Sequence, residues 1–408
     1  MCEVLVIGGG AAGMIAAIAA ARAGASVTLL ERNEKLGKKI YITGKGRCNV
    51  TNDCTRDEFL REVPRNSRFL YAALTAFGPQ DMMAFLEQEG CPVTVQRGRR
   101  VFPSSEKASD VTKALTRAMN ESGVRIRLNT RVRGLWTEEN RCIGVITDSG
   151  EEIRADAVIL ATGGLSVPAT GSSGDGHRMA GETGHTVTDC RPSLSAIETE
   201  EGWPTQLQGL SLKNVRLTLK QGKKTLYTEL GELLFTHFGI SGPLTLEMSC
   251  HLPEDFSDCS VTLNLKPGLT PEQLDARLQR ELAEAPRKHL ASIMPSLLPA
   301  SFAAIFPGLC GIDSQKICAQ VSREERRALC EKLQNLPVTV RKLRGFDEAI
   351  ITRGGVSVRE VDPGTMASKV LPGLYVAGEL LDVDAHTGGY NLQIAFATGH
   401  LAGVSAAI

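Results

Sequence analysis

The chain contains 408 residues, of which 42% are hydrophobic and 23% are charged. This is the composition of a folded globular protein, and chains longer than about 300 residues usually divide into domains. Lys and Arg together number 46, as do Asp and Glu, so the formal net charge is zero. This balance gives no support for a nucleic acid or an anionic membrane as the main partner, and we expect neither.

The first apolar stretch, residues 4–21, is interrupted by four glycines and preceded by Glu3 rather than by basic residues. We therefore expect neither a signal peptide nor a membrane span. The 11 cysteines include no C-x-x-C pair and have no regular spacing. A disulfide framework or a metal site would need such spacing, so we expect no metal and reduced thiols in a cytoplasmic protein.

The N-terminal segment has the order strand, turn, helix, strand. Residues 3–7 have the pattern of a short buried strand, and the Ala-rich residues 11–23 that of a helix ending at Gly24. Residues 25–30 form a second apolar strand, which Glu31 closes. This order predicts the opening of a parallel α/β sheet.

Between the first strand and the helix lies Gly8-Gly-Gly10-Ala-Ala-Gly13, a G-x-G-x-x-G motif. The first glycine permits a tight turn, the second lets the backbone approach a pyrophosphate, and the third lets the helix pack closely on the sheet. Glu31 follows Gly13 by 18 residues, where a carboxylate can accept from a ribose hydroxyl. The unit predicts dinucleotide binding, and Glu31 favours FAD or NAD over NADP.

The rest of the chain changes character three times. Residues 157–161 form an apolar strand that runs into Thr162-Gly-Gly164, and a boundary is expected near Arg191. The sequence is then strand-like to about residue 265 and helical from 271 to 336, with Thr270 and Ser322 as capping signals. From about residue 345 it is again rich in glycine. We expect four segments: 1–190 and 341–408 as the two parts of a nucleotide-binding domain, 191–267 as a β-rich insert, and 268–340 as its helical part.

Two further motifs resemble the flavoprotein superfamily that includes glutathione reductase and fumarate reductase: the Ala161-Thr-Gly163 turn and Gly378-Glu379. The segments 44–49 (GKGRCN), 98–103 (GRRVFP) and 378–393 are similar to those of bacterial BaiN-like, aminoacetone-oxidase-type flavoproteins, and the similarity covers essentially the whole chain. The resemblance implies an α/β fold, in which a Rossmann-like FAD-binding domain is interrupted by a β-barrel-like insert and a small helical subdomain. It implies FAD as the cofactor.

The C-terminal motif also has a physical interpretation. Thr387-Gly-Gly389-Tyr-Asn391 precedes a helical run over residues 392–407. The N-terminus of that helix can direct N–H groups at the pyrimidine end of the flavin, where negative charge develops on reduction. The loop 171–177 (GSSGDGH) resembles a fumarate-reductase segment close to FAD, and the basic run 35–47 can neutralise the diphosphate.

Together these motifs and the resemblance give a set of expected cofactor contacts: Gly8, Gly10, Ala11, Ala12, Gly13, Glu31, Arg32, Lys38, Gly44, Arg47, Cys48, Asn49, Val132, Ala161, Thr162, Gly163, Asp175, Gly378, Glu379, Gly388, Gly389, Tyr390, Asn391 and Leu392.

No residue stands out in the sequence as a catalytic acid or base. His386, beside the Gly388-Gly389 turn, can transfer protons near the flavin or can simply order the loop. His177 has the same two interpretations, and His237 can line a pocket in the insert. Cys48 is flanked by Lys45 and Arg47, which should lower its pKa. Its nearest neighbour, Cys54, has the wrong spacing for a dithiol, so we interpret Cys48 as a wall of the flavin site.

The sequence therefore predicts an FAD-dependent oxidoreductase that transfers hydride between the flavin and a small organic substrate. No second G-x-G-x-x-G unit is present for a nicotinamide nucleotide, so NAD(P)H is expected only as a transient donor. The relatives leave open amine oxidation with O₂ and enone reduction with NAD(P)H. Two other classes are an RNA-modifying flavoenzyme, against which the neutral charge argues, and a non-catalytic flavin-binding protein. The oligomeric state is left open.

Overall fold

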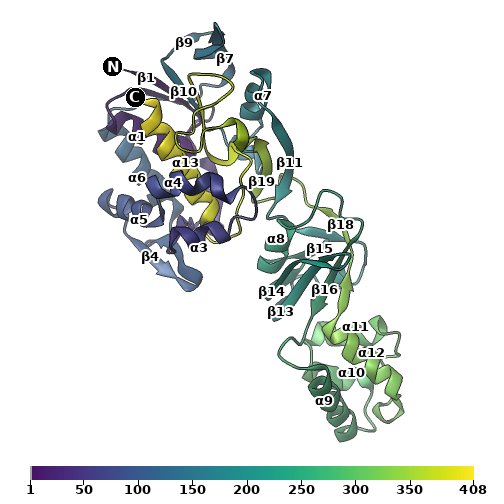
Figure 1. The fold of residues 1–408 in the computed structure, drawn as a ribbon. Helices are drawn as coiled ribbons and strands as arrows, with labels where there is room; N and C mark the ends of the chain where they lie inside the picture. Colours follow the sequence, from purple (N-terminus) through teal and green to yellow (C-terminus); the bar gives the residue numbers. More distant parts are fainter. Residues whose placement is uncertain (1) are drawn as a thin grey trace. The chain divides into compact units, whose positions relative to one another are not determined.

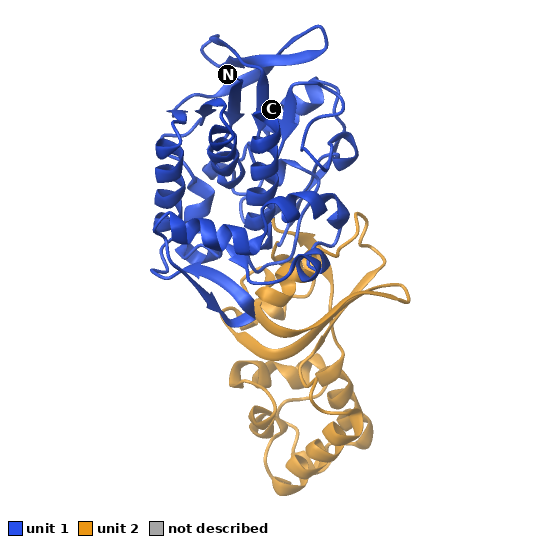
Figure 2. Cartoon of the chain, turned by 60° about the vertical axis from the view of Figure 1, so that its left-hand side comes forward, with its two compact units in different colours: residues 1–194, 345–408 blue, residues 195–344 orange. Residues whose placement is uncertain are grey.

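The computed structural model describes residues 2–408 (Figure 1). They form two compact units, shown in different colours in Figure 2. Unit 1 combines the chain up to Leu194 with Gly345–Ile408, and unit 2 comprises Ser195–Arg344. The four-part division expected from the sequence, with a further boundary at residue 267, stays a prediction.

Unit 1 is built on a five-stranded sheet in the order β20-β10-β1-β2-β6. All four strand pairs are parallel. The strands are β1 (Glu3–Ile7), β2 (Ser26–Leu30), β6 (Arg125–Arg127), β10 (Ala157–Leu160) and β20 (Leu374–Val376). Strands in parallel sheets are buried on both faces, which explains the continuous apolar runs of β1 and β10. The parallel sheet confirms the expected α/β class.

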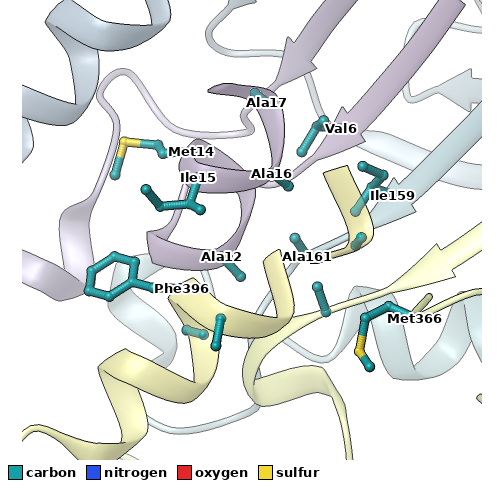
Figure 3. Packing of buried hydrophobic residues seen from close by; sticks show 14 of the residues in the cluster. Val6, Ala12, Met14, Ile15, Ala16, Ala17, Ile159, Ala161, Met366 and Phe396 are labelled. Atoms are coloured by element: carbon teal, nitrogen blue, oxygen red, sulfur yellow. The ribbon is translucent and has the colours of Figure 1, made fainter. Parts of the chain in front are cut away.

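The first and last helices of the chain pack against each other on this sheet. They are α1 (Ala11–Arg22) and α13 (Tyr390–Ala406), and Figure 3 shows Ala12 of α1 next to the α13 ribbon. A Cβ atom at Gly399 or Gly403 would lie 2.3 Å from the carbonyl oxygen of Ala12 or Ala16. Only glycine fits at these two positions, so close backbone contact fixes the N-terminus of α13 relative to the glycine turn before α1.

The remaining elements of unit 1 surround the sheet. Helices and turns are α2 (Lys38–Ile42), η1 (Thr43–Gly46), α3 (Arg56–Arg61), η2 (Ser67–Leu70), α4 (Tyr71–Ala76), α5 (Pro79–Gln88), α6 (Ala108–Glu121) and α7 (Asp175–Glu182). A three-stranded sheet contains β3 (Thr51–Asn52), β5 (Arg100–Pro103) and β4 (Val93–Gln96), and another contains β7 (Val132–Glu138), β8 (Arg141–Thr147) and β9 (Glu152–Arg154). Strands β11 (Val187–Ser193) and β19 (Ile351–Val356) pair antiparallel.

Unit 2 has its own core, which includes Phe235, Phe302 and Phe306. Its seven-stranded antiparallel sheet has the order β17-β16-β13-β14-β15-β12-β18. Thr270 and Ser322 form capping boxes at the starts of two of its helices, as their sequence signals predict. The elements are β12 (Ile197–Thr199), β13 (Ser211–Gln221), β14 (Lys224–Phe235), β15 (Gly239–Ser241), α8 (Pro243–Ser249), β16 (Cys259–Asn264), α9 (Pro271–Glu284), α10 (Leu290–Ile293), α11 (Ala300–Leu309), α12 (Arg323–Gln334), β17 (Leu336–Val338) and β18 (Val340–Leu343).

Within residues 2–408, no helix combines the length and the apolar character needed to cross a membrane. All 11 cysteines are free thiols. The same residues contain no group of three or more His, Cys, Asp or Glu side chains arranged to hold a metal ion.

Candidate functional site

A long groove in unit 1 lies at the carboxyl ends of the parallel strands, where α/β sheets bind nucleotides. It begins at the glycine turn after β1 and reaches the start of α13. Its walls include Gly8–Ala12, Glu31–Asn33, Gly37–Ile40, Thr43, Thr130–Val132, Ala161–Gly163, Thr170–Ser172, Asp175, Met179, Ile350, Ile351, Glu379, Val383, Asn391, Leu392, Ile394 and Ala395. All of these residues belong to unit 1.

The three glycines of the G-x-G-x-x-G turn have different surroundings. Gly8 has a φ of +103°, and a Cβ there would lie 2.6 Å from the carbonyl oxygen of Ala161. A Cβ at Gly13 would lie 1.8 Å from the carbonyl oxygen of Gly8, so the chain itself requires glycine at both positions. A Cβ at Gly10 would meet nothing within 4 Å. This open space at the N-terminus of α1 is the cradle that a pyrophosphate would fill.

Glu31 holds the glycine turn in place. Its carboxylate is buried and accepts hydrogen bonds from the backbone N–H of Gly9 at 2.6 Å and of Asn33 at 2.8 Å. The side-chain amide of Asn33 donates a third bond at 2.7 Å. Because each carboxylate oxygen has two lone pairs, Glu31 can still accept from a ribose hydroxyl in the groove. Sequence reasoning assigned Glu31 this last role and missed its bonds to the turn.

An ion cluster borders the groove where α7 begins. Asp175 accepts hydrogen bonds from Nε and Nη2 of Arg131, each at 2.9 Å, and Arg32 lies 3.1 Å from it. The bonds from Arg131 hold the pKa of Asp175 below its ordinary value, so this carboxylate stays ionised. Arg32 and Asp175 are expected site residues, and Val132 also lines the groove. Arg131 was missed, because only the fold brings it to Asp175.

A second network crosses the groove farther along. The Lys39 ammonium donates to Glu379 at 2.7 Å and to the Ser166 hydroxyl at 2.6 Å. Glu379 also accepts from Ser166 at 2.8 Å and from the backbone N–H of Thr352 at 2.8 Å. Glu379 is an expected site residue. The residue expected from the basic run is Lys38, which also lines the groove and pairs with Glu34 at 2.7 Å. Lys39 was not expected, because only the fold brings it to Glu379.

The hydroxyl of Thr162 is buried and has no hydrogen-bond partner, although the residue lines the groove. It lies beneath the start of α7, where a Cβ at Gly176 would come within 2.0 Å of it. Leaving a buried hydroxyl unpaired is costly, so such atoms in a groove point to a missing polar ligand. The open cradle at Gly10 and the unpaired Thr162 hydroxyl both fit a bound FAD.

The glycine turn before α13 is held from several sides. Gly388 and Gly389 have φ values of +128° and +100°, and a Cβ at Gly389 would lie 2.3 Å from the carbonyl oxygen of Thr51. The Asn52 amide donates to the Gly388 carbonyl at 3.1 Å. Asn391 accepts from the backbone N–H of Ala385 at 2.9 Å and donates to its carbonyl at 2.8 Å. The turn is therefore a rigid lead into a 17-residue helix.

Not every expected site residue lines the groove. Gly13 and Gly378 are packing positions, since a Cβ at Gly378 would lie 2.7 Å from that of Ala12. Tyr390 packs edge-on against Phe59, with ring centroids 5.1 Å apart. The expected residues outside the groove walls are Gly13, Gly44, Arg47, Cys48, Asn49, Gly378, Gly388, Gly389, Tyr390 and His386.

The expectation that Lys45 and Arg47 lower the pKa of Cys48 is wrong. Cys48 is completely buried, and burial raises the pKa of its thiol to about 12. The Arg47 guanidinium lies 4.5 Å from the centroid of the Phe102 ring instead and pairs with Glu106 at 3.3 Å. Loss of hydration therefore outweighs the neighbouring charges, and Cys48 stays a protonated thiol.

The histidines differ in their surroundings. His386 Nδ1 lies 3.0 Å from the Glu62 carboxylate, and the His386 backbone N–H donates to the Glu62 carbonyl at 3.0 Å. His177 is buried on α7, and burial lowers its pKa, which favours a neutral ring. His237 belongs to unit 2, where its ring lies edge-on to Phe238. Of the three, His386 is the one with a carboxylate at hydrogen-bond distance.

A family model described as "HI0933-like protein Rossmann domain" matches residues 2–405. The chain belongs to the HI0933-like family. Over its full length the chain is similar to two bacterial enzymes. It is 32% identical to the 3-dehydro-bile acid delta(4,6)-reductase of Clostridium scindens, covering 100% of this chain and 99% of the relative. It is 30% identical to the ribosomal RNA dihydrouridine synthase of Haemophilus influenzae, covering 99% of this chain and 98% of the relative.

Among solved structures, the HI0933-like protein is similar to 3-ketosteroid delta1-dehydrogenase from Sterolibacterium denitrificans, with a TM-score of 0.53. The match covers 100% of both chains at 16% identity, so it concerns the fold alone. Together with the family match, the comparisons confirm the sequence-based identification: the HI0933-like protein is an FAD-dependent oxidoreductase with a Rossmann-like domain.

Proposed function

We propose that this HI0933-like protein reduces carbon–carbon double bonds conjugated to a carbonyl group, with NADH or NADPH as the electron donor. FAD held in the groove would supply the hydride-transfer chemistry, and the chain's residues would bind and orient it. The absence of a second G-x-G-x-x-G unit from the sequence favours a nicotinamide nucleotide that binds transiently rather than in a domain of its own.

The observation that carries the proposal is that two full-length relatives differ in substrate and agree in bond chemistry. One is named as a reductase of a 3-dehydro-bile acid, in which the double bonds are conjugated to the 3-keto group. The other is named for dihydrouridine, the product of saturating a ring bond that is conjugated to a uracil carbonyl. Both names describe addition of hydride and a proton across an activated double bond.

The chain's own residues would bind and orient the cofactor. We assign the pyrophosphate to the open space at Gly10, the adenosine ribose to Glu31 and one polar contact to the unpaired Thr162 hydroxyl. We assign the pyrimidine end to the turn at Gly388 and Gly389. The N-terminus of α13 would favour the negative charge that develops there, because unpaired N–H groups and the helix dipole both attract it.

Saturating a double bond also takes a proton, and we assign its delivery to His386. The Glu62 carboxylate lies 3.0 Å from Nδ1, which leaves Nε2 as the ring nitrogen that can face a substrate. Such a carboxylate also fixes the orientation of the imidazole. Glu62 would therefore be a positioning residue for His386.

The test is anaerobic stopped-flow with the purified yellow protein, following the flavin absorbance band. We expect rapid bleaching by NADH or NADPH, followed by recovery of the band on adding 2-cyclohexenone or a 3-oxo-Δ4 steroid. Bleaching by amines, with no recovery from any conjugated carbonyl, would make the protein an amine oxidase. Reduction no faster than that of free FAD by every donor would make it a non-catalytic flavin-binding protein.

A further inference from the structure

An arginine-rich hairpin lies outside the groove in unit 1. It consists of β4, a tight turn and β5, and its tip carries Arg97, Arg99 and Arg100, all exposed. Arg99 pairs with Glu58 of α3 at 2.9 Å. Within residues 2–408 the side chains of Arg97 and Arg100 have no hydrogen bond or ion pair, and neither has that of exposed Arg61 at the end of α3. Three cations are thus free to meet a ligand.

One side chain fixes this tip beside the turn assigned to the flavin. The Asn52 amide donates to the carbonyl of Gly98, at the tip, and to that of Gly388, both at 3.1 Å. A small pocket connects the same elements and is lined by Asn52, Arg61, Gly98, Arg99 and Tyr390, among others. Figure 1 shows α3 and β4 in the same part of unit 1. Arg61 therefore lines a pocket that reaches Tyr390 at the start of α13, and Arg97 precedes Gly98, which lines the same pocket.

The carboxylates around this pocket are already paired. Glu58 accepts hydrogen bonds from Arg99 and from the backbone N–H of Thr55, with which it forms the capping box of α3. Glu62 lies at hydrogen-bond distance from His386. Nearby, Glu106 pairs with Arg47, and Asp57 lies 3.6 Å from Arg56. Asp53, whose backbone N–H donates to the Arg99 carbonyl, accepts from the Gln80 amide at 3.2 Å and has no ion pair. The three arginines without a partner outnumber it, so the net charge left at the tip is positive, although the chain as a whole is neutral.

We propose that Arg61, Arg97 and Arg100 form an anion site that binds a charged group of the substrate remote from the bond reduced. The site extends the proposed function, on which it rests, by adding a preference for an anionic substrate. Guanidinium groups bind carboxylate and phosphate oxygens through paired hydrogen bonds. The anion is therefore either the carboxylate of a small molecule or the phosphodiester of an oligonucleotide.

The test compares matched ligands on matched variants. The probes are 3-oxochol-4-en-24-oic acid, its uncharged methyl ester, and a fluorescein-labelled oligouridylate. The variant is Arg97→Ala/Arg100→Ala, and the control is Arg133→Ala, an exposed arginine of β7 away from the hairpin. Dissociation constants are measured by flavin fluorescence or anisotropy at low and high salt, with FAD content as the check on folding.

We expect the double variant to bind the acid or the oligouridylate about tenfold more weakly, as for the loss of two partly exposed charge contacts. Ester binding, FAD content and the Arg133→Ala control should not change. Loss for the acid alone identifies a carboxylate ligand, and loss for the oligouridylate alone identifies a phosphodiester. Equal binding to wild type and variant, or failure of wild type to bind either probe, overturns the anion site. Reduction of the uncharged 2-cyclohexenone tests the reductase separately, because it needs no anion.

Discussion

Replacing Thr162 by Val should have opposite effects on the free protein and on the complex with FAD. Val has nearly the shape of Thr but lacks the hydroxyl, which in this structure is buried without a partner. A buried unpaired hydroxyl costs about 1–3 kcal/mol, whereas a hydrogen bond that is made contributes about 0.5–1.5 kcal/mol. The apoprotein should therefore become more stable by about 1 kcal/mol or more, and the dissociation constant for FAD should rise by about two- to tenfold.

Thr398 is the matched control, because its hydroxyl is buried and fully used. It donates to the carbonyl of Ile394 at 2.6 Å and accepts from the backbone N–H of Gly378 at 3.0 Å. Thr398→Val would leave that N–H without its partner, which should destabilise the apoprotein by about 1–3 kcal/mol. The same chemical change thus has opposite signs at two positions of unit 1.

The measurement is urea unfolding of both apoproteins, followed by FAD titration with flavin fluorescence. A higher midpoint for Thr162→Val, a lower one for Thr398→Val and weaker FAD binding by Thr162→Val would support the reasoning. If Thr162→Val lowers the unfolding free energy as Thr398→Val does, the Thr162 hydroxyl has a partner within the protein. Its assignment to FAD would then be wrong.

Three other predictions follow from the site. Gly10→Ala should fold normally, because a Cβ there meets nothing within 4 Å and the φ of Gly10 is −85°. The variant should nevertheless lose FAD on gel filtration, because the methyl group fills the space assigned to the pyrophosphate. Full retention of FAD would contradict that assignment. Lys39→Met should weaken FAD binding in titration more than Lys38→Met, because Lys39 holds Glu379 and Ser166 together at the groove, whereas Lys38 pairs with an exposed carboxylate, that of Glu34; equal effects would refute this. Cys48 has a folded pKa of about 12 against an ordinary 9.0, so its contribution to stability is complete below pH 9.0 and is lost as the pH rises towards 12. Cys48→Ala should make the denaturation midpoint depend less on pH between pH 9.0 and 12. If the midpoint of the variant depends on pH as strongly as that of the wild type, burial of the Cys48 thiol is not the cause.

The parts of the site that could be predicted from sequence are those in which neighbouring residues determine the backbone. Gly8 follows β1 and has positive φ, and Gly13, in the first turn of α1, packs against the Gly8 carbonyl, so both requirements arise within a few residues. The glycine pair before α13 is similar, since both residues have positive φ. Local patterns of this kind also predicted the capping residues and the parallel strands.

The parts that sequence could not predict depend on contacts between distant segments. Lys39 and Glu379 are separated by 340 positions, and Arg131 and Asp175 by 44. For Cys48 the error came from adjacent residues, because Lys45 and Arg47 suggested a thiol with a lowered pKa. Folding turns Arg47 towards Phe102 and buries the cysteine. Adjacency in sequence is therefore a poor guide to the electrostatic surroundings of a side chain.

The topology of unit 1 makes the groove independent of residues 195–344. Strands β11 and β19 pair antiparallel, so the chain leaves unit 1 for residues 195–344 and returns to it at adjacent strands. The groove residues all belong to unit 1, and the C-terminal helix is fixed to α1 through Gly399 and Gly403. Because residues 195–344 start and end at this one strand pair, their sequence can change without moving the groove. The residues that line the groove can then stay in place when residues 195–344 change.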